Sequence, residues 1–150
     1  MATPSGSFNL DKDTHSTGTV RLFSGNAYVD GALQRGWFVG HFLEQTAEFR
    51  ATPLIEVKWS VYHTGDKKQF WGASLTATTL CILIKGNITI WFPLTECTLS
   101  REGDYVIWPA GIPHRWTIAE DALVLTIRWP SIAGDYFEQF QSEITNLNES

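Results

Sequence analysis

Several features that would assign this chain of 150 residues to a familiar class are scarce or missing. No uninterrupted apolar run approaches the roughly 18 residues that a membrane span requires. The opening residues 1–18 lack both the charged and the apolar region of a secretory signal. We therefore expect no membrane partner and a cytoplasmic location. The chain has only two cysteines, without close Cys or His spacing, so we expect buried thiols and no disulfide.

Basic residues are scarce as well. The net charge is −5, and residues 131–150 contain four acidic residues and no Lys or Arg. The other 130 residues hold 12 acidic against 11 basic residues. Binding to nucleic acid needs a basic stripe that neutralises phosphates. We therefore expect no nucleic-acid partner.

The chain does contain enough apolar residues to form the core of one domain. Hydrophobic residues make up 43% of it, including 7 Trp and 9 Phe, so a packed core can form. Residues 1–19 are polar and predict an N-terminal arm. Short β-like runs separated by Gly and Pro fill residues 20–130, which indicates an all-β sandwich or barrel.

The apolar spacing changes only in residues 131–150. There, large apolar residues recur at intervals of 3, 4 and 3, and Asp135 precedes Glu138 in a cap-like pair. This spacing predicts a short C-terminal helix. The apolar residues concerned are Phe137, Phe140, Ile144 and Leu147.

Residues 55–63 alternate with a period of two, which is typical of a half-buried strand. One parity holds Val57, Trp59 and His63, and the other holds Glu56 and Lys58. If the apolar parity is buried, His63 also points into the interior at the end of the strand. Further along, Gly86 after Lys85 predicts a tight hairpin between two β-rich runs. Runs at 105–109 and 122–129 predict two more strands.

One segment carries a family resemblance. Residues 103–118, GDYVIWPAGIPHRWTI, are similar to the second conserved motif of the cupin superfamily, G-x5-P-x-G-x2-H-x3-N. Gly103, Pro109, Gly111 and His114 match, and Ile118 replaces the Asn. The resemblance implies a double-stranded β-barrel, or jelly roll, over about residues 20–130, and a homodimer. After the Pro-x-Gly bend, alternation predicts that His114 and Trp116 face the cavity.

The first cupin motif, G-x5-H-x-H-x3,4-E-x6-G, matches poorly when its last Gly is placed on Gly86. The Glu position then falls on Thr79, and the His positions fall within residues 72–75. None of these side chains is a good ligand, so the resemblance implies that the usual metal site, and with it a metal cofactor, is missing. A relocated site would need residues from several strands, and Glu56 and His63 have opposite parity. Its candidate ligands are His41, Glu56, His63 and His114.

Tryptophans and cations complete the candidate site. We expect Trp71, Trp116 and Arg128 to contact a ligand, because indoles with a few polar groups typically line an apolar site. Arg128 shares the parity of buried residues and needs a partner, for which Glu56 is one candidate. Lys58, Lys67 and Lys68 could also meet a carboxylate or phosphate, although solvated surface is the default for Lys67 and Lys68.

These observations predict a cupin-like barrel protein that binds a small, partly apolar molecule in its barrel, with no cofactor. The alternative is an enzyme of the isomerase, cyclase or lyase type. It would use His63 or His114 as a general base, since imidazole exchanges protons near neutral pH, with or without a non-standard metal site. A third hypothesis is an interaction protein that assembles through the C-terminal helix.

Overall fold

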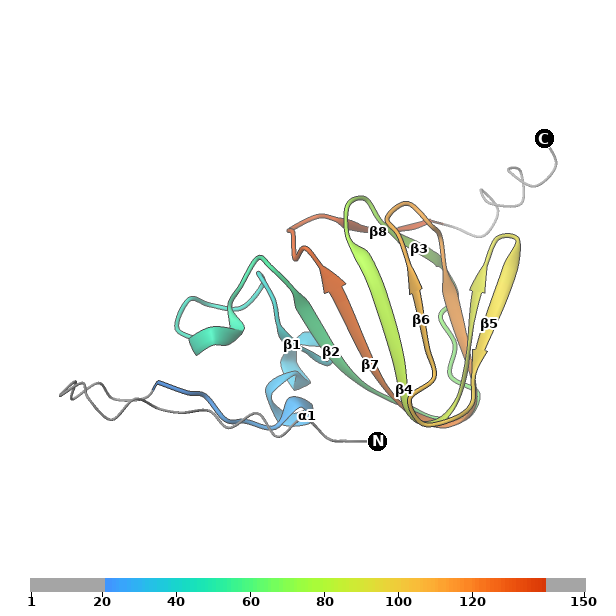
Figure 1. The fold of residues 1–150 in the computed structure, drawn as a ribbon, viewed down its shortest axis with the longest axis horizontal. Coiled ribbons are helices and arrows are strands. Elements are labelled where there is room, and N and C mark those ends of the chain that lie inside the picture. The colour runs from blue at the N-terminus through green and yellow to red at the C-terminus, as the bar shows by residue number, and fades with distance from the viewer. Residues whose placement is uncertain (1–20, 140–150) are drawn as a thin grey trace, which may run out of the picture.

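A computed structural model describes residues 21–139 and shows a barrel of antiparallel strands (Figure 1). The strands are β1 (Trp37–Val39), β2 (Glu56–Tyr62), β3 (Trp71–Ser74), β4 (Thr78–Phe92), β5 (Thr95–Leu99), β6 (Tyr105–Trp108), β7 (Arg115–Trp129) and β8 (Tyr136–Gln139). Helix α1 (Ala27–Asp30) and two 3₁₀ turns, η1 (Ala32–Gln34) and η2 (Glu48–Arg50), accompany them. No helix in this part of the chain is long and apolar enough to cross a membrane.

Two long strands, β4 and β7, form the frame of the barrel. They pair with each other along most of their length and curve together around one end of the molecule (Figure 1). The first half of β4 also pairs with β6 and the second half with β5, while β2 and then β1 continue the sheet beyond β7. Strands β3 and β8 form a separate two-stranded sheet.

The apolar core lies in the bend of these strands. Leu83, Ile88, Ile90 and Val124 are at most 2% exposed and belong to one cluster. Burial of each such side chain contributes about 1.5 to 3 kcal/mol. The cluster therefore holds the two halves of the barrel together beneath the cavity described below.

The predicted hairpin at Lys85 and Gly86 is wrong, because β4 runs through this point as one strand. The register against β7 shifts here, and Gly86 has a φ of 97°. A Cβ on Gly86 would run into the carbonyl oxygen of Asp121 and the Cα of Ala122. The glycine thus permits an irregularity at the bend of the barrel, where β4 and β7 approach closely.

The predicted facing of residues 55–63 is also wrong. The even parity faces inward: Glu56 and Ser60 are buried, and Lys58 lines the cavity. Val61 is 43% exposed, and with Trp59 it lines a hollow on the outer surface. Alternation shows only that a strand has two faces. Here the inner face carries the polar side chains because it borders a cavity.

The C-terminal helix is not confirmed. Residues 136–139 form strand β8, paired in register with β3, and the remaining predicted helix lies outside the described residues. Asp135 does not cap a helix. Its buried Oδ2 accepts a hydrogen bond of 3.0 Å from the backbone N–H of Ala77. Pairing with β3 satisfies the backbone here and turns Tyr136 and Glu138 towards the cavity.

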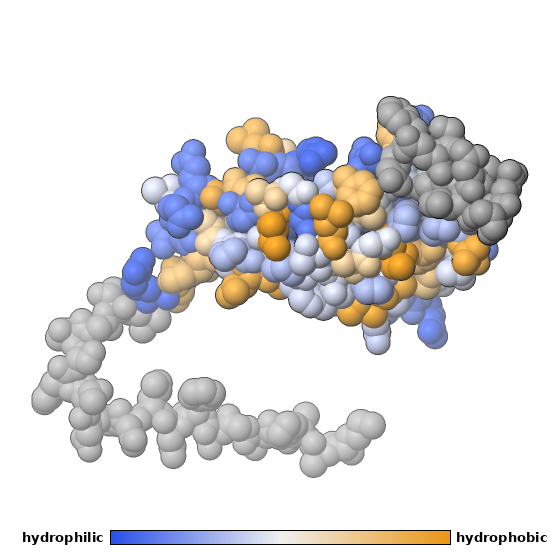
Figure 2. Space-filling view, turned by 90° about the horizontal axis from the view of Figure 1, so that it is seen from above, coloured by the Kyte–Doolittle hydropathy of each residue, from blue (hydrophilic) through white to orange (hydrophobic). Residues whose placement is uncertain are grey.

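Other local predictions hold. Strands occur at 105–108 and across 122–129, and Gly111 has a φ of 82° in the bend after Pro109. Cys81 and Cys97 are free thiols, but only Cys81 is buried as predicted, and Cys97 is partly exposed. On the outer surface, hydrophobic side chains are scattered among hydrophilic ones in the view of Figure 2. The homodimer stays a prediction.

Candidate ligand-binding site

A cavity of about 350 Å³ lies between the strands of the barrel. Its deep wall is apolar and includes Ile88, Ile90 and Val124. Aromatic rings form much of the remaining wall, and Tyr62 and Trp116 contact each other with ring centroids 4.3 Å apart. A volume in the range of about 300–1,000 Å³ is typical of small-molecule sites.

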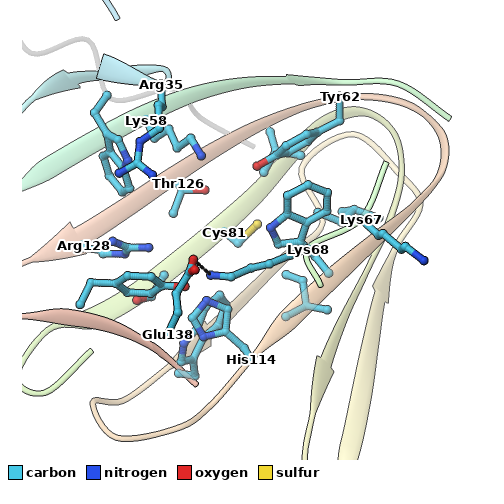
Figure 3. A pocket seen from close by; sticks show the side chains of 18 residues that line it. Arg35, Lys58, Tyr62, Lys67, Lys68, Cys81, His114, Thr126, Arg128 and Glu138 are labelled. Atoms are coloured by element: carbon cyan, nitrogen blue, oxygen red, sulfur yellow. Dashed lines mark ion pairs between the residues drawn. The ribbon is translucent and has the colours of Figure 1, made fainter. Parts of the chain in front are cut away.

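Cationic side chains dominate the charge of this cavity (Figure 3). Among residues 21–139, five of them line it, against a single carboxylate, that of Glu138. They come from four separate segments of the chain: Arg35, Lys58, Lys67, Lys68 and Arg128. The protein as a whole has a net charge of −5, so positive charge is concentrated at this one site.

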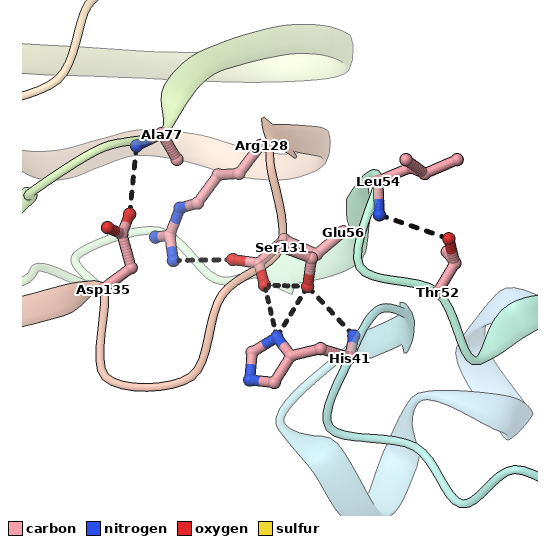
Figure 4. Close-up of polar contacts among 8 residues, drawn as sticks. All are labelled: His41, Thr52, Leu54, Glu56, Ala77, Arg128, Ser131 and Asp135. Carbon is pink, nitrogen blue, oxygen red and sulfur yellow. Dashed lines mark hydrogen bonds and ion pairs between the residues drawn. The ribbon is translucent and has the colours of Figure 1, made fainter.

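Arg128 is the most firmly held of these cations. Its guanidinium lies between two rings, 4.7 Å from the centroid of Trp37 and 4.3 Å from that of Tyr136. Its Nη1 donates a hydrogen bond of 3.3 Å to Oε1 of Glu56 (Figure 4). The predicted partial burial of Arg128 and its predicted partner are thus confirmed. Stacking and the charge pair fix the direction in which this guanidinium faces the cavity.

Glu56 is itself held from the other side. Its Oε2 accepts a hydrogen bond of 2.9 Å from the hydroxyl of Ser131, and Nδ1 of His41 lies 3.6 Å from the same oxygen. His41 Nδ1 also lies 2.7 Å from the Ser131 hydroxyl. Both carboxylate oxygens therefore have partners, which a buried charge requires. This network positions Arg128 from behind the cavity wall.

Lys68 brings a second cation into the cavity. Its ammonium lies 3.4 Å from Glu138 Oε1 and 4.4 Å from the centroid of the Tyr136 ring. Burial lowers its pKa, and Glu138 opposes that shift. The side chain is only 16% exposed, so the default of solvated surface is wrong for Lys68. Lys67 is exposed and borders the cavity.

His114 lies in the wall, as the motif predicts. It is 6% exposed, and its ring centroid is 4.7 Å from that of Trp108. Burial, first of all, lowers the pKa of His114 to about 3, and the charges of Lys68 and Arg128 act in the same direction. The imidazole is therefore neutral at pH 7, a hydrogen-bonding group rather than a strong base.

Several buried polar atoms in the described part of the chain have no hydrogen-bond partner within the protein. Three of them belong to residues that line the cavity: Thr79 Oγ1, Arg128 Nε and the Tyr136 hydroxyl. Buried polar groups nearly always have partners, so unpaired ones need an explanation.

The cavity does not fit the metal of the cupin family. Thr79 stands at the Glu position, and Gly72 is one candidate for the first His position. A Cβ on Gly72 would meet the Tyr136 hydroxyl and come within 2.7 Å of the Lys68 ammonium. Within residues 21–139 no three side chains of His, Cys, Asp or Glu gather in a possible metal site. Lys68 thus brings positive charge close to Gly72.

The structure separates some of the predicted site residues. His114, Trp116 and Arg128 line one cavity, whereas His63 is on the surface, its side chain 76% exposed and its Nδ1 3.8 Å from Asp66. The inward prediction for His63 is wrong, because its parity faces out. Trp71 is the first residue of strand β3. It is 8% exposed, it contacts the Arg115 guanidinium at 5.0 Å, and it is not a lining residue.

The proposed relocated metal ligands do not come together either. His41 and Glu56 meet in the network behind Arg128, His114 lies in the cavity wall, and His63 lies on the surface. Sequence reasoning missed Arg35, which adopts a left-handed backbone conformation (φ 56°) after η1 and reaches the rim of the cavity. No sequence motif marks Arg35, and its separation in sequence from the other cations gives no local signal that it shares their cavity.

Comparison with known proteins supports the fold. No family model and no curated protein matches the chain. An uncharacterised conserved protein with a double-stranded β-helix domain from Klebsiella pneumoniae is 17% identical, with a TM-score of 0.53, covering 60% of this chain and 78% of that one. A mutant of salicylate 1,2-dioxygenase from Pseudoaminobacter salicylatoxidans is 11% identical, with a TM-score of 0.50, covering 60% of this chain and 26% of that one.

A cupin-2 domain protein from Shewanella frigidimarina is also similar, at 18% identity and a TM-score of 0.45, covering 53% of this chain and 74% of that one. At such identities the comparisons establish the fold alone. The chain has an antiparallel double-stranded β-barrel, so the predicted all-β barrel is confirmed, whereas its predicted C-terminal helix is not.

Proposed function

We propose that the barrel binds a small organic anion, a carboxylate or phosphate attached to an apolar or aromatic body. The observation that carries the proposal is the excess of five cations over one carboxylate among the described residues of the cavity wall. Glu138 is already paired with Lys68, and Arg128 is paired with Glu56 behind the cavity wall, which leaves Arg35, Lys58 and Lys67 without a carboxylate partner in residues 21–139. The remaining positive charge favours an anion, and the low dielectric of a partly enclosed site strengthens the attraction.

The rest of the wall suits the other part of such a molecule. Tyr62, Trp108 and Trp116 offer ring faces, and the isoleucines behind them offer apolar contact. Arg128 is held by stacking and by Glu56, so little side-chain freedom is lost when it binds an anion. His114 is neutral and adds a hydrogen-bonding group without adding charge.

The alternative of an enzyme with a barrel histidine as general base has no specific observation in its favour. His63 is outside the cavity, and the pKa of His114, lowered to about 3 by burial first of all, makes it a weak base at pH 7. That alternative stays a prediction.

A titration with matched probes tests the proposal. Intrinsic tryptophan fluorescence would follow binding of benzoate, phenyl phosphate and the neutral analogue benzamide. We expect the two anions to bind and benzamide to bind at least about tenfold more weakly, because a charge-assisted hydrogen bond contributes about 1.5–3 kcal/mol. Equal binding of benzamide and the anions, or no binding of either anion, would contradict the proposal.

Variants locate the site of binding. Arg128→Gln should weaken benzoate by about 10- to 150-fold. The control is Arg101→Gln, whose side chain is 87% exposed and does not line the cavity. It removes the same charge and should leave the affinity unchanged. If both variants weaken binding alike, the anion responds to net charge rather than to the cavity.

A further inference from the structure

Lys58 differs from Lys68 and Arg128, the other partly buried cations of the cavity. Lys68 is paired with Glu138 and Arg128 with Glu56, but in residues 21–139 no ion pair joins Lys58 to a carboxylate. Its ammonium lies 5.8 Å from the centroid of the Trp37 ring and points into the cavity (Figure 3). A buried cation without a counter-charge is costly, so the protein is expected to favour its neutral form.

The charges around Lys58 act in that direction. Burial, first of all, lowers the pKa of Lys58 to about 8; Arg128, Arg35 and Lys68 act in the same direction, and Cys81 acts in the opposite one. Near pH 8 roughly half of the molecules then hold a free amine in the cavity, where an exposed lysine is almost entirely protonated. A desolvated lysine beside other cations is a known way to make an amine nucleophile.

The same two guanidiniums that disfavour the ammonium are suited to hold a carboxylate. Arg128 and Arg35 line the cavity with Lys58, and Tyr62, Trp108 and Trp116 line it as well. A carboxylate bound there brings the carbon next to it towards the amine of Lys58. Among small anions with an apolar body, a 2-oxo acid is the class that carries an electrophilic carbonyl at that carbon.

We infer that Lys58 forms a reversible imine with the carbonyl of a 2-oxo acid bound in the barrel. The inference rests on the proposed function, because it needs the anion to bind first. The neutral amine attacks C2, forming a C–N bond while the carbonyl π electrons move to oxygen. Proton transfer from nitrogen to that oxygen gives a carbinolamine. Loss of its hydroxyl with a second proton from nitrogen, as water, leaves the C=N bond.

Reductive trapping tests the inference. The full chain is incubated at pH 8 with phenylpyruvate and sodium cyanoborohydride, which reduces an imine to a stable secondary amine, and the adduct is mapped by peptide mass spectrometry. We expect the adduct on Lys58 in at least about tenfold excess over any other lysine, because burial lowers its pKa to about 8 without a paired carboxylate, whereas Glu138 holds the Lys68 ammonium and Lys67 and Lys85 are exposed. Lys58→Arg should remove it. Lys85→Arg, at an exposed residue away from the cavity, should not.

Binding is measured separately, so that the two proposals fail in different ways. If phenylpyruvate displaces benzoate but no adduct forms on Lys58, the imine is refuted and anion binding stands. An adduct on Lys67, Lys68 or Lys85 in comparable yield also refutes it. If neither benzoate nor phenylpyruvate binds, the proposed function itself is wrong. Mapping in the unmodified chain decides the question even if Lys58→Arg folds poorly.

Discussion

Replacement of Glu56 by Gln tests the network that positions Arg128. The change is nearly isosteric, but it removes the negative charge that lies 3.3 Å from the guanidinium. The two side chains are 14% and 12% exposed, so solvent screens the remaining charge of Arg128 only in part. The variant therefore leaves a mostly buried cation without its partner.

The expected cost follows from this burial. Breaking a buried ion pair by removing one partner costs about 3–5 kcal/mol. Because the pair retains some exposure, we expect the lower end, about 3 kcal/mol. For a domain of this size that corresponds to a fall in Tm of about 6–12 °C. Arg128 would also lose its fixed direction, so benzoate should bind more weakly.

Urea unfolding followed by tryptophan fluorescence measures the free energy of unfolding. Glu96→Gln is the control, because Glu96 is exposed and has no ion pair among the described residues. The double variant Glu56→Gln with Arg128→Met should be less destabilised than the sum of its single changes, since it leaves no buried charge. A cost for Glu56→Gln equal to that of Glu96→Gln, or strict additivity in the double variant, would refute the reasoning.

Two further predictions concern His114 and Gly86. Burial lowers the pKa of His114 to about 3 in the folded protein, whereas its pKa in the unfolded chain is near 6.5. The unfolded state therefore binds the proton more readily, and the free energy of unfolding falls as the pH drops from 6.5 towards 3. Between pH 6.5 and 4, the His114→Gln variant should lose about 3 kcal/mol less of its free energy of unfolding than the unmodified protein, measured by urea unfolding at each pH. Plots of this free energy against pH that run parallel for the two proteins would contradict the prediction. Gly86→Ala should lower the free energy of unfolding by more than about 1 kcal/mol, and by more than Gly103→Ala does. Both glycines have a positive φ, but of the two only Gly86 has atoms close enough for an added Cβ to meet them. Equal thermal shifts for the two glycine variants would contradict this.

Local sequence signals were reliable where short-range geometry determines the structure. The Pro109-x-Gly111 bend and the strand that follows it place His114 and Trp116 in the cavity wall, as alternation predicts. Alternation failed in β2, where it shows two faces but not which one is inside. The C-terminal spacing failed at residues 136–139, because pairing with β3 overrides a weak helical pattern.

The sequence by itself determined the all-β character, the cupin-like bend and the poor match to the family's metal ligands, since each depends on residues close together along the chain. Only the tertiary structure decided which charges share a cavity. Cations from four separate segments of the chain meet because β2, β7 and the segments beside them curve around one space. These cations are Arg35, Lys58, Lys68 and Arg128. The chemistry of the site thus comes from contacts between distant segments, which no local pattern records.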